Sequence, residues 1–315
     1  MAFKLPNSKL PDVKTTIFAE MSLLAQQENA VNLSQGFPDY QPDENLIKYL
    51  GDFAKQGQNQ YAPLFGIKEL REEISRKFNL QYQVDYQPDS EINVTAGATQ
   101  GIFTIISAFV EKGDEVIIFE PAYDCYEPAI ILNGGIVKNV KMLYPDYKIN
   151  WDEVKNLVSE KTKMIIINNP NNPSGTTVTK AEFAEFMDAV PSDVLVALDE
   201  AYIEYNRNAD TPLGTELFGA YPNVVFLRTF SKAYGLAGVR VGYAYGPEDV
   251  IAALNKVAIP FSINAVAQAG ATALGYGTGL GHRKVPAAVV QCADALGLPL
   301  VEVPLETPFI ALSHL

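Results

Sequence analysis

Short segments of strand character alternate with helical patterns along most of this chain, and this alternation constrains the fold more than any other feature. Between the strands lie amphipathic patterns, such as residues 67–78 and 102–110, whose apolar positions follow helical spacing. Alternating strands and helices predict an α/β fold with helices on both faces of a mixed, mostly parallel seven-strand sheet. We expect its strands near residues 91–96, 115–119, 136–141, 163–168, 194–199, 224–229 and 240–245.

One lysine lies just beyond the strand near 224–229. Lys232 is flanked by the hydroxyls of Thr229 and Ser231 and by small and apolar residues, and Arg240 follows eight residues later. A lysine is ordinarily a solvated surface group. Burial would lower its pKa, because the charged form loses hydration, and a neutral amine can form a Schiff base with an aldehyde cofactor. Lys232 is therefore either a surface group or the attachment point of such a cofactor.

Two other strands also end in polar residues. Asp199 ends the strand near 194–199, where an unpaired carboxylate costs free energy, so Asp199 is either a helix cap or the partner of a cationic group. The Asn-Pro loop at residues 169–175 follows the strand near 163–168. Such dipeptides are typical of plain loops, but the carboxyl ends of strands are also where open α/β sheets bind ligands.

A glycine turn at Gly97 joins the strand near 91–96 to a helical pattern that begins with Ala98, Thr99 and Gln100. The unpaired N–H groups and the dipole of a helix start attract anions, and small residues let a phosphate approach the backbone. Tight turns before helices are common, so this turn is a phosphate site only if other motifs support it.

Charge and composition argue against several classes of function. The 315 residues carry a net charge of −13, which disfavours nucleic acid and anionic membranes, since either requires a basic face. No signal peptide or membrane span is evident, so we expect a cytoplasmic protein. Two cysteines, Cys125 and Cys292, form no disulfide framework, and only two histidines are present, so we expect no metal site and no Ser/His/Asp triad.

The lysine segment 228–243 resembles the lysine motif of the fold-type I, class I/II aminotransferases, which depend on pyridoxal 5′-phosphate (PLP). The glycine turn, the Asn-Pro loop and the strand ending in Asp199 match further motifs of this family in the expected order, and the resemblance extends from about residue 15 to 272. It implies a fold-type I architecture. The expected parts are a large PLP-binding domain at residues 46–250, an N-terminal segment 1–45 and a small C-terminal domain at 251–315.

The resemblance also implies roles for individual residues. Lys232 would hold the cofactor as a Schiff base and act as the catalytic base, and Asp199 would keep the pyridine nitrogen protonated. Tyr202 and Asn172 would contact the phenolic oxygen, and Tyr123 would stack on the pyridine ring. The residues expected around the cofactor phosphate are Ala98, Thr99, Gln100, Thr229, Ser231 and Arg240.

Two further residues acquire roles in the same way. Gly36, in the loop at residues 31–39, would bring a backbone N–H close to the substrate carboxylate. Tyr61 would reach the cofactor phosphate of a partner subunit, which implies a homodimer with shared active sites. The other expected partners are the small-molecule substrates, an amino acid and a 2-oxo acid.

Beyond residue 272 the sequence departs from the family pattern. A glycine-rich stretch at 275–281 replaces a long helix, and Arg283, the only arginine after Arg240, lies in the wrong context to bind a substrate carboxylate. We therefore expect the small domain to be incomplete, as in a fragment, a truncation or a chimera. Such a chain should bind PLP better than it turns over substrate.

The sequence leaves the reaction open. We expect transamination between an L-amino acid and a 2-oxo acid, because the loop at 31–39 resembles the kynurenine, glutamine and methionine aminotransferases, which suggests a methionine, glutamine or aromatic substrate. Residues 195–270 instead resemble histidinol-phosphate aminotransferase. A C–S or β-lyase on the same fold is another alternative, because fold does not fix reaction. A PLP-binding regulator would carry an N-terminal DNA-binding segment, which we do not find.

Overall fold

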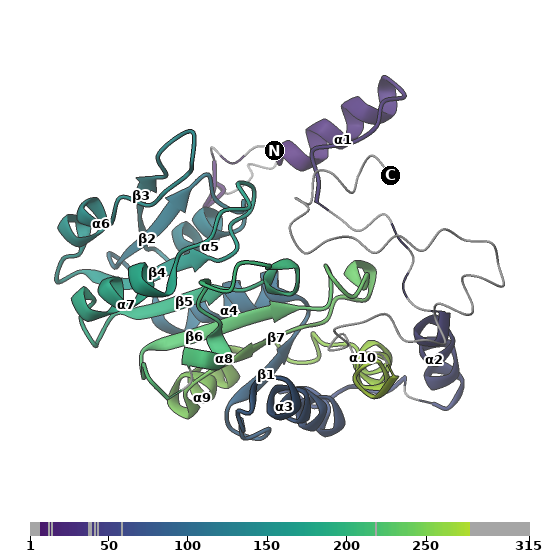
Figure 1. Ribbon diagram of the computed structural model, residues 1–315. Helices are drawn as coiled ribbons and strands as arrows, with labels where there is room; N and C mark the ends of the chain where they lie inside the picture. Colours follow the sequence, from purple (N-terminus) through teal and green to yellow (C-terminus); the bar gives the residue numbers. More distant parts are fainter. Residues whose placement is uncertain are drawn as a thin grey trace, which may run out of the picture.

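The protein is centred on one seven-stranded sheet with helices on both sides (Figure 1). The computed structural model describes residues 7–11, 13, 15–36, 40, 42, 44–57, 59–217 and 219–277. The α/β architecture predicted from the alternating pattern is confirmed.

Each predicted strand is present, close to its expected bounds. The strands are β1 (Ile92–Thr95), β2 (Glu115–Glu120), β3 (Ile136–Lys141), β4 (Thr162–Asn168), β5 (Leu195–Asp199), β6 (Val224–Thr229) and β7 (Gly242–Tyr245). Their order across the sheet is β1-β7-β6-β5-β4-β2-β3. Strand β7 runs antiparallel to both β1 and β6, and the other neighbours are parallel, so the sheet is mixed and mostly parallel, as predicted.

Consecutive side chains of each central strand enter two different cores, because they point to opposite faces of the sheet. In β4, Ile165 and Ile167 belong to one core and Met164 and Ile166 to the other. The first core is covered by α3 (Lys68–Tyr82), α6 (Trp151–Leu157) and α7 (Lys180–Ala189). The second core is covered by α4 (Ala98–Phe109), α5 (Tyr126–Leu132) and α9 (Glu248–Val257).

The start of α7 shows how local sequence sets a helix boundary. Thr179 Oγ1 accepts a hydrogen bond from the backbone N–H of Glu182 at 3.2 Å, and Glu182 Oε2 accepts one from the backbone N–H of Thr179 at 2.8 Å. These two bonds form a capping box, which the sequence Thr179-Lys180-Ala181-Glu182 encodes through a threonine followed three residues later by a glutamate. Three shorter elements complete this part of the chain, namely η1 (Ile203–Tyr205), α8 (Gly214–Leu217) and η2 (Ala237–Val239).

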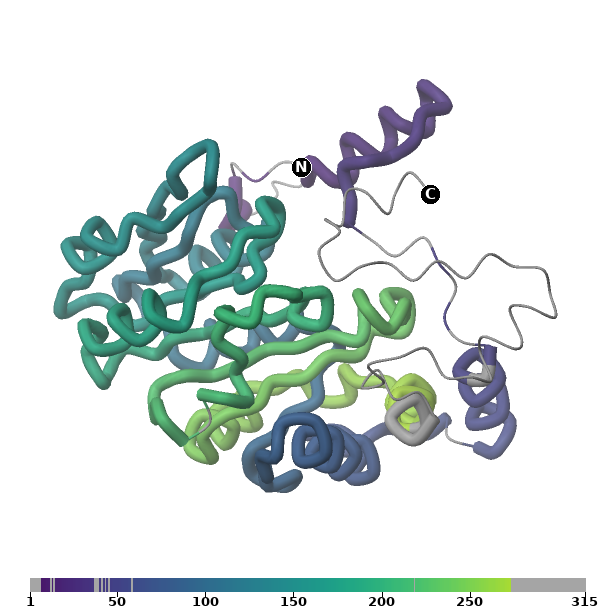
Figure 2. The backbone as a smooth tube through the Cα atoms, viewed as in Figure 1, coloured from purple at the N-terminus to yellow at the C-terminus, as the bar shows by residue number. Residues whose placement is uncertain are grey.

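The remaining helices lie at the periphery. Helix α1 (Ile17–Gln27) has no buried residue and lies away from the sheet (Figure 2). Helix α10 (Ala265–Gly277) packs against α2 (Glu44–Lys55) and α3, and Gln268 of α10 accepts a hydrogen bond from the backbone N–H of Ile67 at 2.8 Å. The glycine-rich stretch beyond residue 277 and the predicted small-domain strand lie outside the described residues, so the domain boundaries stay a prediction.

None of the helices in the described ranges has the length and apolar character that crossing a bilayer requires.

Gly242, the first residue of β7, generates a stability prediction. A Cβ atom at this position would lie 2.5 Å from the backbone nitrogen of Ala98 and 3.0 Å from the carbonyl oxygen of Arg228. Backbone atoms cannot move aside as flexible side chains do, so we expect Gly242→Ala to lower the free energy of unfolding by about 1–3 kcal/mol. Urea unfolding of the cofactor-free protein measures this change.

Gly238→Ala is the matched control, because nothing lies within 4 Å of a Cβ at Gly238. This control should unfold at nearly the same urea concentration as the wild type. Equal midpoints for both alanine variants would contradict the packing argument.

Candidate active site

The strand register brings several predicted residues to one edge of the sheet. Asp199 at the end of β5 lies opposite Asn168 at the end of β4, and Thr229 at the end of β6 lies opposite Gly242. Because β4, β5 and β6 are parallel, the loops that follow them leave the sheet on the same side. The candidate residues therefore converge at the carboxyl edge, where open α/β sheets bind ligands.

Lys232 is half-buried just beyond β6. Its Nζ donates a hydrogen bond to the carbonyl oxygen of Gly36 at 3.0 Å and lies 5.1 Å from the centre of the Tyr202 ring. Desolvation lowers the pKa of Lys232, Arg240 lowers it further, and the carboxylate of Asp199 opposes the shift. Such an amine is neutral at a lower pH than a solvated lysine, which a nucleophile or general base requires.

Asp199 is a buried carboxylate held in one orientation. Its Oδ2 accepts a hydrogen bond from the hydroxyl of Tyr126 at 2.7 Å, and its Oδ1 accepts one from the backbone N–H of Ala201 at 3.0 Å. Burial raises the pKa of Asp199, and both hydrogen bonds oppose this rise. No ion pair to Asp199 forms within the part of the chain that the structure describes. A buried carboxylate with two donors and no such ion pair is suited to a cationic group on a ligand.

Tyr202 and Asn172 lie together beside Lys232. The side-chain amide of Asn172 donates a hydrogen bond to the hydroxyl of Tyr202 at 3.4 Å. Burial raises the pKa of Tyr202 to about 12, and Asp199 adds to this rise, so the hydroxyl stays protonated at neutral pH and can donate to an anionic oxygen. A Cβ at Gly36 would lie 3.6 Å from this hydroxyl, which places the loop of Gly36 in the same cluster.

A set of donors gathers where β6, β7 and α4 meet. The hydroxyl of Thr229 donates to Ser231 Oγ at 2.9 Å, and Arg240 Nη1 donates to the same oxygen at 3.3 Å. The guanidinium of Arg240 lies against Gly97, where any Cβ would overlap it, and Gly97 has a φ of 84°. Gly97 also precedes α4, whose first N–H groups have no partner inside the helix. Hydroxyls, a guanidinium and helix N–H groups together suit a phosphate.

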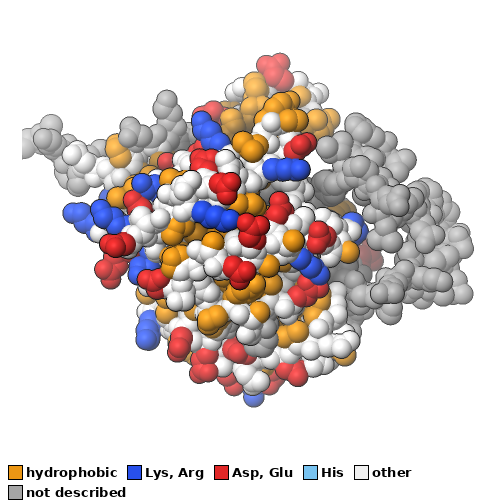
Figure 3. Space-filling view, turned by 60° about the vertical axis from the view of Figure 1, so that its left-hand side comes forward, with side chains coloured by type: hydrophobic (Ala, Val, Ile, Leu, Met, Phe, Trp, Pro, Cys, Tyr) orange, Lys and Arg blue, Asp and Glu red, His pale blue; other side chains and the backbone are white. Residues whose placement is uncertain are grey.

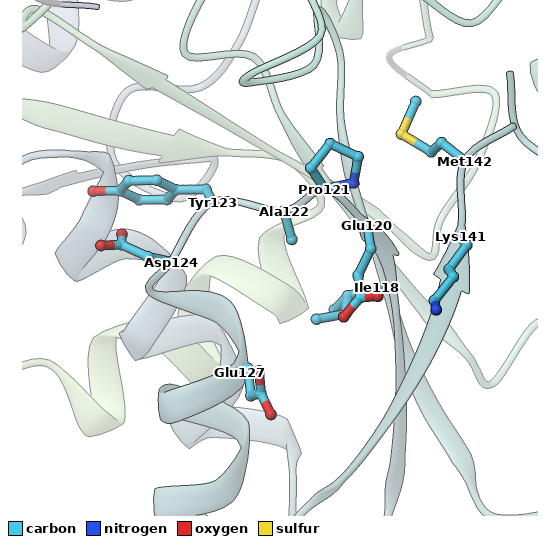
Figure 4. Close-up of a pocket in the computed structure, with 9 residues that line it drawn as sticks. All are labelled: Ile118, Glu120, Pro121, Ala122, Tyr123, Asp124, Glu127, Lys141 and Met142. Atoms are coloured by element: carbon cyan, nitrogen blue, oxygen red, sulfur yellow. The ribbon is translucent and has the colours of Figure 1, made fainter. Parts of the chain in front are cut away.

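Thr99 and Tyr123 lie at the side of this cluster. Their hydroxyl oxygens are 3.1 Å apart, so one donates a hydrogen bond to the other. Tyr123 is one of the residues that line a cavity of about 470 Å³, and its ring points away from Glu120 and Lys141, which also line that cavity (Figure 4). Its hydroxyl instead contacts the first turn of α4, which is where a stacking ring beside a phosphate site would lie.

Two predicted residues have other contacts in this chain. The side-chain oxygen of Gln100 accepts a hydrogen bond from the backbone N–H of Ala96 at 2.7 Å, so this side chain holds the turn before α4. Tyr61 is 76% exposed, and its ring centre lies 4.3 Å from that of Phe261. The expected role of Tyr61 requires a second chain and stays a prediction.

Tyr126 contacts Asp199 but is not among the residues predicted from the sequence. This residue begins α5, is 2% exposed, and donates the side-chain hydrogen bond that Asp199 accepts. Its only signal in the sequence is its place shortly after the strand near 115–119, whose carboxyl end lies at the same edge of the sheet. That position is shared with several other polar residues, so the pattern alone could not single it out.

The arrangement fits PLP, the cofactor that the sequence implies. A buried carboxylate without an ion-pair partner suits a protonated pyridine nitrogen, and the cluster around Arg240 and the start of α4 suits a phosphate. Between them, Lys232 offers an amine of lowered pKa. No group of His, Cys, Asp and Glu side chains that could hold a metal ion occurs in the described ranges.

Charged side chains of both signs are mixed on one face of the molecular surface (Figure 3). On the face drawn in Figure 3, acidic and basic side chains are interspersed among apolar ones, and its described part has no continuous basic area.

The sequence profile of the family described as aminotransferase class I and II matches residues 28–283. A second profile, described as the purine catabolism regulatory protein-like family, matches residues 256–314. The second match overlaps the first, and most of it lies outside the described residues.

The chain is also similar to individual aminotransferases. Methionine aminotransferase of Escherichia coli (strain K12) is 42% identical over 271 residues, which are 84% of this chain and 69% of that protein. Aromatic amino acid aminotransferase of Corynebacterium glutamicum (strain R) is 42% identical over 245 residues, which are 78% of this chain and 69% of that protein. Among solved structures, YbdL from Escherichia coli, described as having a methionine aminotransferase function, matches with a TM-score of 0.83 and 40% identity over 87% of this chain and 73% of that chain.

The hydrogen bond from Tyr126 to Asp199 generates a prediction about PLP affinity. Tyr126→Phe keeps the ring but removes the donor, so the pKa of Asp199 should rise further. We expect about tenfold weaker PLP binding at neutral pH, because a hydrogen bond to a charged group is lost. The loss should increase as the pH falls, since more of the carboxyl is then protonated. Titration of the apoprotein with PLP at several pH values measures this.

Tyr123→Phe is the control, because it removes a hydroxyl that contacts Thr99 and not Asp199. Its effect on PLP affinity should not increase as the pH falls. A Tyr126→Phe variant that binds PLP like the wild type across the pH range would contradict the role of Tyr126.

Proposed function

The chain belongs to the class I and II aminotransferases, which depend on PLP, and from this premise we propose how its own residues perform amino-group transfer. Its function is that of an amino-acid aminotransferase, and the proposed donor is an L-amino acid of methionine, glutamine or aromatic type with a 2-oxo acid as acceptor. One observation carries this proposal: the half-buried amine of Lys232 lies at the same sheet edge as the buried carboxylate of Asp199.

Lys232 is proposed to move the proton of the reaction. When bound, PLP supplies the electron sink that stabilises negative charge at the substrate Cα. The lowered pKa of Lys232 increases the fraction of neutral amine, which can accept the Cα proton and return it as a general acid. The carbonyl oxygen of Gly36, 3.0 Å from Nζ, orients the amine from the substrate side.

The surrounding residues are proposed to orient and tune the cofactor. Asp199, held by Tyr126 and Ala201, keeps a proton on the pyridine nitrogen. The hydroxyl of Tyr202, which accepts a hydrogen bond from the Asn172 amide, donates to the phenolic oxygen. The phosphate binds among the hydroxyls of Thr229 and Ser231, the guanidinium of Arg240 and the first N–H groups of α4.

A direct test removes the amine. We expect Lys232→Ala to lose the visible absorption band that the wild-type protein shows with PLP, because the amine proposed to hold the cofactor is removed. Lys68→Ala is the control, since Lys68 lies on the exposed side of α3 and pairs with Glu72. A colourless wild type in excess PLP, or a band that survives in Lys232→Ala, would contradict the assignment.

The substrate class is tested in the first half of the reaction. The PLP form is mixed with excess L-methionine, L-glutamine, L-phenylalanine or histidinol phosphate, and the loss of the visible band is followed. We expect the fastest loss with L-methionine or the aromatic L-phenylalanine, because the similar proteins are named as methionine and aromatic amino acid aminotransferases. Fastest conversion of histidinol phosphate would favour that alternative substrate instead. An intact band with every amine would refute transamination of these compounds.

The same mixtures separate transamination from a lyase reaction on this fold. A transaminase turns over only when a 2-oxo acid acceptor is present, whereas a lyase releases ammonia and a keto acid without one. Ammonia release from L-methionine without an acceptor would contradict the proposal.

The proposed enzyme is a homodimer in which Tyr61 of each subunit completes the phosphate site of the other. The exposed pair of Tyr61 and Phe261 supports this, since two large aromatic rings in contact remain 76% and 64% exposed in the single chain.

Mixing two defective proteins tests the shared site. Tyr61→Ala and Lys232→Ala should each bind PLP poorly, whereas subunit exchange between them should restore about a quarter of the normal sites. This recovery occurs because a mixed dimer has one site with both residues. No recovery after verified subunit exchange would contradict sharing. A monomer in sedimentation would contradict the dimer.

A further inference from the structure

Four buried or half-buried side chains lie one or two residues away in the sequence from residues of the candidate site. They are Glu200, Glu204, Arg228 and Tyr234. Because consecutive strand residues face opposite sides, Glu200 and Arg228 lie on the face covered by α3, behind the site. Arg228 accordingly lies over the ring of Phe78 in α3, 5.1 Å from its centre. These four residues and Lys77 of α3 are called the backing network below.

The first part of the backing network is a fully buried ion pair. Arg228 Nε donates to Glu200 Oε2 at 2.8 Å, and the two side chains are 2% and 0% exposed. The same carboxylate accepts hydrogen bonds from the backbone N–H of Gly214 at 2.7 Å and from the hydroxyl of Tyr245. This pair therefore fixes the ends of β5 and β6 relative to each other from the α3 side.

The second part reaches the loop that carries Lys232. The ammonium of Lys77 donates a hydrogen bond to the hydroxyl of Tyr234 and lies 4.7 Å from the centre of its ring. The hydroxyl of Tyr234 donates in turn to Glu204 Oε1 at 3.4 Å. Tyr234 lies two residues beyond Lys232, inside a turn closed by a hydrogen bond from the N–H of Gly235 to the carbonyl of Lys232 at 3.0 Å. Lys77 thus holds the far side of this turn.

Burying the charged groups of Lys77 and Glu204 disfavours the folded state, because both lose hydration. Desolvation lowers the pKa of Lys77 to about 8, against the opposing effect of Glu204. Burial likewise raises the pKa of Glu204. Its Oε2 has no hydrogen-bond partner among the described residues. Apolar side chains of similar size would fill the same space without these penalties. A residue that costs stability at this position points to a role in placing the neighbouring loop.

We propose that Lys77 is a positioning residue for Lys232, acting through the hydroxyl of Tyr234. By holding Tyr234 between α3 and Glu204, Lys77 fixes the turn from which the Lys232 side chain reaches the cofactor site. The ring of Tyr234 packs on Phe230, with centres 5.0 Å apart, so the turn keeps its apolar contact even when the hydroxyl is lost. This inference rests on the proposed attachment of PLP to Lys232.

The experiment follows attachment of PLP to the apoprotein, which needs no substrate. Apoproteins of the wild type, Lys77→Met, Tyr234→Phe and the double variant are mixed with PLP. The rise of the visible band gives the rate. Borohydride reduction followed by peptide mapping then gives the fraction of PLP on Lys232. Urea unfolding of each apoprotein measures stability separately. The control is Lys68→Met, an exposed lysine of the same helix.

We expect Lys77→Met and Tyr234→Phe each to slow attachment about tenfold and to place more PLP on other lysines, since small displacements of a reacting group cost this much or more. The double variant should be no slower than the singles, because both act through one hydrogen bond. Lys77→Met leaves the buried carboxylate of Glu204 without this cation, so its urea midpoint should fall, but across the variants the loss of attachment rate should not scale with the loss of stability. Lys68→Met should match the wild type in every measurement.

Three outcomes separate the alternatives. A wild-type attachment rate in Tyr234→Phe would overturn the proposed action through the hydroxyl. Because this variant keeps its aromatic ring, it still tests the proposal if Lys77→Met does not fold. Slower attachment in proportion to lost stability would mean that Lys77 has only a structural role, which also overturns the proposal. A wild type that attaches no PLP to Lys232 would instead refute the proposed function.

Discussion

Consecutive polar residues at the end of a central strand lie on opposite faces of the sheet, because successive side chains of a strand point in opposite directions. At the end of β5, Asp199 turns toward α5 and meets the hydroxyl of Tyr126, whereas Glu200 turns toward α3 and meets Arg228. At the end of β6, Arg228 and Thr229 divide in the same way. One sheet edge therefore carries two polar clusters back to back, one facing the cofactor site and the other facing α3.

Both clusters contain a carboxylate that burial removes from water, but only one of the two carboxylates has an ion-pair partner. On the site face, burial leaves Asp199 with two hydrogen bonds and a raised pKa, so its charge is best stabilised by a cationic group from a ligand. On the opposite face, Glu200 already has Arg228 and further donors. Removing one member of such a buried pair costs about 3–5 kcal/mol, because the other charge is left unpaired. Glu200 thus has a cationic partner within the chain, whereas Asp199 has none among the described residues.

The sequence predicted the strands and the residues at their ends, since strands buried on both faces form continuous apolar runs that end in polar loops. Lys232, Asp199 and the Asn-Pro loop at residues 169–175 could be found in this way, whereas Asn172 was singled out within that loop by the family resemblance. Tyr126 and Lys77 could not, because their partners lie 73 and 157 residues away and depend on how α5 and α3 pack on the sheet. The contribution of Tyr61 depends on a second chain, which no pattern within one sequence can position.

Gly242 is in close contact with the backbone of both α4 and β6. Its Cα passes so close to the backbone nitrogen of Ala98 and the carbonyl of Arg228 that even a methyl group would overlap both. The start of α4 is thereby packed against the backbone of Arg228, which pairs with Glu200 on the opposite face. Since interiors are close-packed and transmit strain, a displacement of the Arg228 backbone would be felt at the start of α4. The two polar clusters on opposite faces of the sheet are thus linked through backbone contacts at Gly242.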